Sequence, residues 1–337
     1  MARPPAAIDT ARLFEALAGE GGTGLAVTAL DDGTSADPMS GPGVVRVGVH
    51  RRGERPTAGL EPFDILLSTD ADAPRPWVGL APDRIDAALG CLEDVARSRP
   101  TAATVAAQVL RMTLALSFEQ ALALESFAYS MLLASGDFLA WRAATPVRYR
   151  EEPDAPRVLQ SWVNGAFVLS LNRPHARNSV DAQMRDELAE ALAFALSDPD
   201  AGPVAIMGLG SAFSAGGDLD EFGQAKDPGI AHLVRVLRSP TGLLHRLGAR
   251  ATVYVHGACV GAGIETPAAA GRIVARPDAY FRLPEVSMGL IPGAGGTASI
   301  PRRIGRRRAA YMAITGWDVD AATALSWGLV DAVEPTD

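Results

Sequence analysis

The chain has 337 residues, a formal net charge of −8, 48% hydrophobic residues and 21% charged residues. This length allows two domains or one large one, and the composition is ordinary for a soluble globular protein. The acidic balance disfavours general nucleic-acid binding, although a local basic patch would be enough to bind an anionic small ligand. We expect no transmembrane helix and no signal peptide, because the chain has neither a long uncharged apolar run nor an apolar start followed by a cleavage site.

The chain contains two cysteines, Cys91 and Cys259. Two cysteines cannot build a disulfide framework, and the residues around them lack the spacing of metal ligands. We therefore expect a protein of the reducing cytoplasm that has no metal site.

The first segment, residues 1–80, is rich in glycine, proline and aspartate. We predict a short helix at residues 10–18 and strands at residues 24–30, 44–50 and 63–68. In the second of these strands Val45, Val47 and Val49 would share one face.

The second segment, residues 81–150, has helical periodicity. Apolar residues recur at helical spacing from Ile85 to Val95, and a second helix is predicted over residues 102–115. The residues Ser117-Phe-Glu-Gln120 have a capping-box pattern and begin a third helix. That helix contains Leu122, Phe127 and Met131, and the charged, proline-bearing residues 146–156 after it are predicted to be a linker.

The third segment, residues 151–337, alternates strands with helices, as a layered α/β domain does. We predict strands at residues 166–171, 204–207, 252–255 and 272–275, and a helix at residues 181–196. The basic residues between Arg302 and Arg308 are best interpreted as a solvated or subunit-facing helix surface, with contact to an anionic ligand as the alternative.

Two glutamates in glycine-rich surroundings are the strongest functional signal. Glu265 ends Gly261-Ala-Gly-Ile-Glu265, and Glu285 lies between Pro284 and the glycine-rich run that ends at Thr297. Paired carboxylates can divide acid and base work on one water, and nearby turns can aim N–H groups at a developing oxyanion. A third small-residue stretch, Phe213-Ser-Ala-Gly-Gly-Asp-Leu219, follows a predicted strand. Each stretch alone is also compatible with an ordinary turn into a helix.

Together these stretches, with Leu171-Asn-Arg-Pro-His-Ala-Arg-Asn178, resemble the crotonase superfamily, also called the enoyl-CoA hydratase/isomerase family. The resemblance covers residue 158 to the end in the family's order. It implies a crotonase-like layered β-β-α core, which makes the whole chain an α/β protein with an N-terminal α/β and helical extension.

The resemblance also assigns residues. The backbone N–H groups of Gly217 and Ala262 would form an oxyanion hole for a thioester carbonyl, although the family more often has glycine at the second position. Glu265 would activate the water that adds to the β-carbon, and Glu285 would supply the proton to the α-carbon. Further substrate contacts are expected from Ala215, Gly216, Asp218 and Gly261, with Arg177 at the nucleotide end of coenzyme A.

Because family isomerases commonly keep only the second acid, two glutamates favour a hydratase that adds water to an enoyl-CoA. The alternatives are a double-bond isomerase or another acyl-CoA enzyme of the family, and a non-catalytic acyl-CoA-binding or RNA-binding paralogue. The implied partner is an acyl-CoA thioester, with no cofactor beyond its coenzyme A, no nucleic acid and no membrane. A homo-oligomer, trimer or hexamer, is expected from the family.

The family core normally continues past its Gly-Leu-Val segment into closing helices, whereas this sequence ends soon after Gly328-Leu-Val330. Residues 85–142 resemble those helices in order and motif. We hypothesise a circular permutation that has moved the closing helices to the front of the chain. The alternative is that residues 1–145 are the degenerate remnant of a duplicated family unit. Both hypotheses predict that residues 85–142 pack on the core that follows or on a neighbouring subunit.

Overall fold

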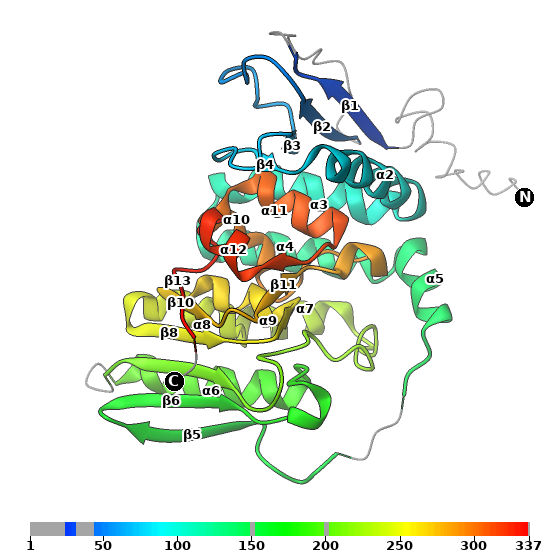
Figure 1. Ribbon diagram of the computed structural model, residues 1–337. Coiled ribbons are helices and arrows are strands. Elements are labelled where there is room, and N and C mark those ends of the chain that lie inside the picture. Colours follow the sequence, from blue (N-terminus) through cyan, green and yellow to red (C-terminus); the bar gives the residue numbers. More distant parts are fainter. Residues whose placement is uncertain (1–23, 32–43, 149–151, 199–201, 336–337) are drawn as a thin grey trace, which may run out of the picture.

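The computed structural model describes residues 24–31, 44–148, 152–198 and 202–335. In Figure 1 a small sheet lies at one end, a layer of helices lies in the middle, and a larger sheet lies at the other end. The predicted helix at residues 10–18 lies outside the described residues. Within the described residues, none of the helices is both long and apolar enough to cross a bilayer.

The N-terminal sheet has four parallel strands in chain order, which are β1 (Leu25–Ala29), β2 (Val45–His50), β3 (Ile65–Ser68) and β4 (Val78–Gly79). The first three confirm the predicted strands, and β4 was not predicted because two residues show no periodicity. Val45, Val47 and Val49 are buried, as predicted, and belong to the main core. The opposite face covers a smaller apolar cluster that includes Phe63 and Trp77.

The helical segment contains α2 (Pro82–Ser98), α3 (Pro100–Met112), the 3₁₀ turn η2 (Thr113–Ala115), α4 (Phe118–Leu132) and α5 (Gly136–Ala144). The capping box is confirmed, since the amide of Gln120 donates to Ser117 Oγ at 3.2 Å and the amide of Ser117 donates to Gln120 Oε1 at 3.0 Å. Leu122 is buried, but Phe127 and Met131 are 60% and 56% exposed. The inward face of α4 is instead the one that presents Ala121 and Glu125.

The largest sheet has six strands in the order β13-β10-β8-β7-β6-β5 and is parallel except for β5. Its strands are β5 (Val158–Val163), β6 (Ala166–Leu171), β7 (Val204–Gly208), β8 (Ala251–Val255), β10 (Arg272–Ala275) and β13 (Ala332–Val333). A third sheet contains β9 (Ala258–Val260), β11 (Tyr280–Arg282) and β12 (Val319–Asp320). The four strands predicted in this segment are confirmed, whereas β5 and the two- and three-residue strands were not predicted.

The remaining helices connect and cover these sheets. They are α6 (Ala182–Ser197), α7 (Pro228–Leu237), α8 (Pro240–Leu247), α9 (Ala262–Glu265), α10 (Gly296–Ile304), α11 (Arg306–Thr315) and α12 (Ala321–Trp327). The 3₁₀ turns are η3 (Pro174–Ala176), η4 (Gly248–Arg250), η5 (Pro267–Ala269) and η6 (Glu285–Met288). The predicted helix at residues 181–196 is confirmed as α6, and Asp181 caps it by accepting from the amide of Met184 at 2.8 Å.

The helical segment packs on the following core. Helix α4 contacts α7 and α10, α3 contacts α11, and one continuous apolar cluster includes Leu92 and Phe138 together with Phe281. A detached helical domain is therefore excluded for the described residues.

Two arginines of α11, Arg307 and Arg308, are buried within the chain. This differs from the prediction that the basic residues 302–308 form a solvated or subunit-facing helix surface. Arg307 Nε donates to the carbonyl of Phe63 at 3.1 Å, and Arg308 Nε donates to the carbonyl of Trp77 at 2.8 Å. Both acceptors belong to the N-terminal segment, whose carbonyls at these points are left unused by the parallel sheet. The basic side chains thus fasten that segment to α11.

Candidate active site

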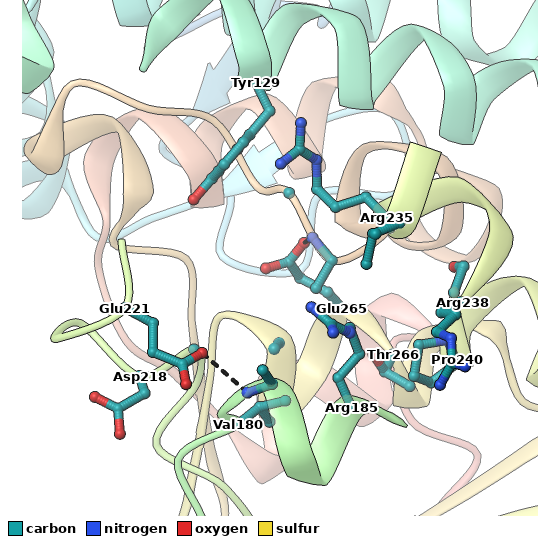
Figure 2. A pocket seen from close by; sticks show the side chains of 18 of the residues that line it. Tyr129, Val180, Arg185, Asp218, Glu221, Arg235, Arg238, Pro240, Glu265 and Thr266 are labelled. Atoms are coloured by element: carbon teal, nitrogen blue, oxygen red, sulfur yellow. Dashed lines mark hydrogen bonds between the residues drawn. The ribbon is translucent and has the colours of Figure 1, made fainter. Parts of the chain in front are cut away.

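The glutamates and the glycine-rich loops meet in a cavity of about 630 Å³, whose lining includes Leu122 of α4 and Val253 of the six-stranded sheet. Gly217, Ala262, Glu265 and Glu285 all line it. In Figure 2 the side chain of Glu265 lies near the centre, with Asp218 and Glu221 on one side and Arg235 on the other.

Hydrogen bonds between the 213–217 loop and β9 bring two distant glycine-rich stretches together. The amide of Ser214 donates to the carbonyl of Ala258 at 3.1 Å, and the amide of Val260 donates to the carbonyl of Ser214 at 3.0 Å. Gly216 has φ of +93°, and a Cβ on it would lie 2.7 Å from the carbonyl oxygen of Val260. Only glycine fits this close backbone approach, which places Gly217 beside the start of α9.

Two backbone amides in the cavity wall are free to bind a ligand. Within the described residues, neither the Gly217 amide nor the Ala262 amide donates to a protein acceptor. The amide that follows Gly217 is already used, because Asp218 N donates to the carbonyl of Val180 at 2.9 Å. Two free donors on one wall form the arrangement that stabilises negative charge on a carbonyl oxygen.

Glu265 is a buried carboxylate held by two backbone donors. Its Oε2 accepts from the amides of Ala294 and Gly296 at 2.8 and 2.9 Å. Burial raises the pKa of Glu265 to about 7, and the two amide hydrogen bonds oppose that rise. At neutral pH this carboxyl group is therefore poised between its two protonation states, which suits a general base.

Glu285 is also buried, but its carboxyl group is not held by two backbone donors as that of Glu265 is. Its Oε2 has no hydrogen-bond partner among the described residues. Burial, and next the charge of Glu265, raise the pKa of Glu285 well above its ordinary value. A protonated carboxyl group in this place can donate to a bound molecule. A Cβ on Gly261 would lie 2.4 Å from Glu285 Oε1 and 3.8 Å from Glu265 Oε1, so the two carboxyl groups flank the same glycine.

The other predicted site residues lie around this centre. Asp218 lines the cavity, but its Oδ2 accepts from Arg173 Nη1 at 2.6 Å. Ala215 and Gly216 form the backbone behind the Gly217 amide, and the Ala215 amide donates to the carbonyl of Arg177 at 2.9 Å. The Arg177 side chain is exposed outside the cavity lining. Gly261 separates the two carboxyl groups, and contacts of these residues with substrate stay predictions.

Most of the residues that line the cavity were not predicted, and three polar ones among them are Glu125, Tyr129 and Arg235. Glu125 and Tyr129 come from α4, and Arg235 comes from α7. No local motif marks them, because their partners lie more than 100 positions away along the chain.

A family model described as enoyl-CoA hydratase/isomerase matches residues 162–337. The chain belongs to the enoyl-CoA hydratase/isomerase family. A mevalonyl-coenzyme A hydratase of Beauveria bassiana is 35% identical over 177 residues, which are 50% of this chain and 63% of that protein. A 2,3-dehydroadipyl-CoA hydratase of Escherichia coli is 34% identical over 172 residues, which are 51% of this chain and 66% of that protein. The chain thus spans less than two thirds of the length of these family members.

The structural comparison agrees with the family assignment. A crystal structure of a putative enoyl-CoA hydratase/isomerase (crotonase) from Legionella pneumophila aligns with a TM-score of 0.50 and 27% identity, over 54% of this chain and 71% of that one. The predicted crotonase-like α/β fold is therefore confirmed for the core.

Proposed function

We propose that this family member adds water across the double bond of an enoyl-CoA thioester. The observation that supports it best is the pairing of two differently held, buried carboxyl groups with two free amides in one cavity. Environments that distinguish two nearby carboxyl groups are typical of sites where one acts as base and the other as acid.

In this proposal the thioester oxygen accepts from the amides of Gly217 and Ala262. The carboxylate of Glu265 takes a proton from water while the water oxygen bonds to the β-carbon. The electron pair of the double bond moves towards the thioester oxygen, where the two amides stabilise the enolate. The enolate then collapses, and its α-carbon takes the proton of Glu285. Proton exchange with water returns both carboxyl groups to their starting states.

The test follows loss of the enoyl thioester absorbance of crotonyl-CoA. Glu265→Gln and Glu285→Gln should each lower kcat by about 10²-fold or more, because each removes a general acid or base. Glu119→Gln, on the exposed side of α4, is the matched control and should keep the wild-type rate. Wild-type activity retained in both site variants would refute the assignment. Turnover of a β,γ-unsaturated acyl-CoA without hydration would favour the isomerase instead.

We further propose that coenzyme A within the substrate is the only cofactor-like group involved and that the protein acts in the cytoplasm. The free thiols of Cys91 and Cys259 support a reducing compartment. The net charge of −8 supports a protein that binds no nucleic acid. We also propose a homo-oligomer, trimer or hexamer, which sedimentation velocity would test.

Finally, we propose three segments: an α/β segment at residues 1–80, a closing helical segment at residues 81–150, and the catalytic core at residues 151–337. The position of Glu125 and Tyr129 in the cavity wall supports a covering role for the second segment. A circular permutation that places the closing helices before the core would explain why residues 81–150 cover the cavity, and it requires no duplicated unit.

A further inference from the structure

Glu125 is a third buried carboxyl group in the cavity, and it comes from the closing helical segment. It is 2% exposed. Its Oε1 accepts from the amide of Gly295 at 2.6 Å, and its Oε2 accepts from the amide and the hydroxyl of Thr297, each at 2.7 Å. Three donors on one buried carboxyl group fix its orientation closely.

The same loop also holds Glu265. The amides of Ala294 and Gly296 donate to Glu265, whereas those of Gly295 and Thr297 donate to Glu125. Four successive amides therefore alternate between two carboxyl groups on opposite sides of one loop. Any shift of the loop relative to Glu125 also moves the donors that orient Glu265.

We propose that Glu125 is a positioning residue for the hydration proposed above, and that it acts through the amides of residues 294–297 to hold the Glu265 carboxylate towards the reacting water. Glu125 itself does not touch the substrate in this proposal. It lies across the loop from Glu265, and the other titratable groups near these two carboxyl groups are Tyr129, Glu285 and Arg235.

The hydrogen bonds from this loop also bear on the pKa of Glu265. Burial and the charge of Glu265 raise the pKa of Glu125 to about 8, so Glu125 stays largely protonated while Glu265 ionises. Burial raises the pKa of Glu265 to about 7, and the amides of Ala294 and Gly296 lower it. If Glu125 holds these amides in place, its removal should weaken their hydrogen bonds to Glu265 and raise the pKa of Glu265 further.

The experiment compares Glu125→Gln, Thr297→Val and the control Glu119→Gln in crotonyl-CoA hydration across the pH range. Glu125→Gln should lower kcat by about 10- to 100-fold with a smaller change in KM, because a misplaced base slows chemistry more than binding. The acidic limb of its kcat/KM profile should move to higher pH, because Glu265 loses part of the amide hydrogen bonding that lowers its pKa. Thr297→Val removes one of the three donors to Glu125, and it should lower kcat less and move that limb less.

Wild-type kcat and an unmoved acidic limb in a folded Glu125→Gln variant would overturn the positioning role. If Glu125→Gln does not fold, a wild-type kcat in Thr297→Val would overturn it. If the wild-type protein hydrates no enoyl-CoA, the proposed function fails instead. In that case the ¹³C carboxyl resonance of Glu265, identified by its absence in Glu265→Gln, still reports the pKa of Glu265 without turnover. An identical pKa of Glu265 in wild type and Glu125→Gln would then overturn the effect of Glu125 on Glu265.

A separate observation concerns Arg235, on the cavity side opposite Asp218 in Figure 2. Its Nε donates to Ser126 Oγ at 3.0 Å, and its guanidinium lies 5.1 Å from the ring centre of Tyr129. No carboxylate of the described residues forms an ion pair with it. Arg185, by contrast, also lines the cavity and pairs with Asp186 at 2.9 Å. Burial lowers the pKa of Arg235, and its Nη2 donates to two neutral acceptors, the carbonyl of Ser126 and Ser130 Oγ.

We propose, again on the basis of the hydration proposed above, that Arg235 binds a carboxylate at the far end of the acyl chain. Gly217 lies beside Asp218 in the chain, and Glu265 lies between Asp218 and Arg235 in the view of Figure 2. An acyl chain held at the Gly217 amide and passing Glu265 would extend towards Arg235. A terminal carboxylate would supply the charged acceptor that this guanidinium lacks.

The test compares a trans-2-enoyl-CoA that ends in a carboxylate with its methyl ester. The wild-type kcat/KM should favour the carboxylate by about 10-fold or more, and Arg235→Met should abolish most of that ratio. An equal kcat/KM for the two substrates, or a ratio unchanged in Arg235→Met, would overturn the proposal. If neither substrate is hydrated, the proposed function fails, and calorimetric binding of the two saturated analogues then gives the same comparison.

Discussion

Arg173 donates from Nη1 to Asp218 Oδ2 at 2.6 Å, and both side chains are more than nine-tenths buried. The pair fastens the residue after Gly217 to the loop that follows β6. Asp218→Ala should lower the free energy of unfolding by about 1.5–3 kcal/mol, because the buried guanidinium loses one charged acceptor and keeps Glu152 and Asp181. Urea denaturation measures the change. Asp186→Ala, which removes a more exposed partner of Arg185, should cost less than about 1 kcal/mol. Equal costs for the two variants would contradict the structural role of the buried pair.

Two glycines allow each catalytic candidate to be displaced separately. A Cβ on Gly261 would lie 2.4 Å from Glu285 Oε1, and one on Gly296 would lie 2.6 Å from Glu265 Cγ. Gly261→Ala and Gly296→Ala should each lower kcat for crotonyl-CoA by about 10- to 100-fold, because small displacements of catalytic groups are costly. Gly90→Ala in α2, where a Cβ meets nothing within 4 Å, is the control. Wild-type kcat in both site variants would argue against roles for the two carboxyl groups.

The buried carboxyl groups should make stability depend on pH. The folded-state pKa of Glu265 is raised from 4.5 to about 7. The folded chain therefore holds this proton where the unfolded chain has lost it, and the stabilisation is complete below about pH 4.5 and lost as pH rises through about 7. Glu265→Gln should gain on the order of 1–3 kcal/mol relative to wild type between about pH 5 and pH 8. Urea denaturation at both pH values measures this, and a pH-independent difference would contradict the raised pKa.

The N-terminal segment should depend on Arg308. This side chain donates to the carbonyls of Trp77 and Ala73 at 2.8 and 3.1 Å. Arg308→Met should lower stability by about 1–3 kcal/mol, because the buried carbonyls lose their donors. Arg97→Met, on the exposed side of α2, should change stability by less than about 0.5 kcal/mol. Hydrogen exchange should show faster exchange in β3 and β4 of Arg308→Met alone. Equal protection in the two variants would be evidence against the fastening role.

The proposed catalytic pair was predictable as a feature of the cavity because its signals are local. Glu265 and Glu285 lie within short glycine-rich stretches, and glycine there reflects close backbone approaches that any chain with this site needs. The strands β6, β7, β8 and β10 were likewise predictable, because continuous apolar runs mark strands buried in a parallel sheet. The short strands β9 and β11 were not, since three residues cannot show a period.

Glu125 and Arg235 were missed for a different reason. A glutamate on an otherwise apolar helix resembles a solvated position until the partner loop is known, and that loop lies 170 positions later. Phe127 and Met131 are the opposite case, since both are apolar and yet exposed, so apolar type alone does not decide which face of α4 is buried. Periodicity identified the helix, but tertiary contacts chose its inward face.

The order of the segments along the chain bears on how the protein is made. The ribosome completes α2 to α5 before it reaches any strand of the six-stranded sheet, and the loop that receives Glu125 follows 170 residues after it. Until α10 and α11 emerge, the faces of α3 and α4 that contact these two helices have no partner. Contacts between residues so far apart in the sequence form slowly, and helices whose partners are not yet synthesised expose apolar surfaces that can aggregate. The nascent chain therefore exposes these apolar faces until late in its synthesis, which is the condition under which chaperones bind.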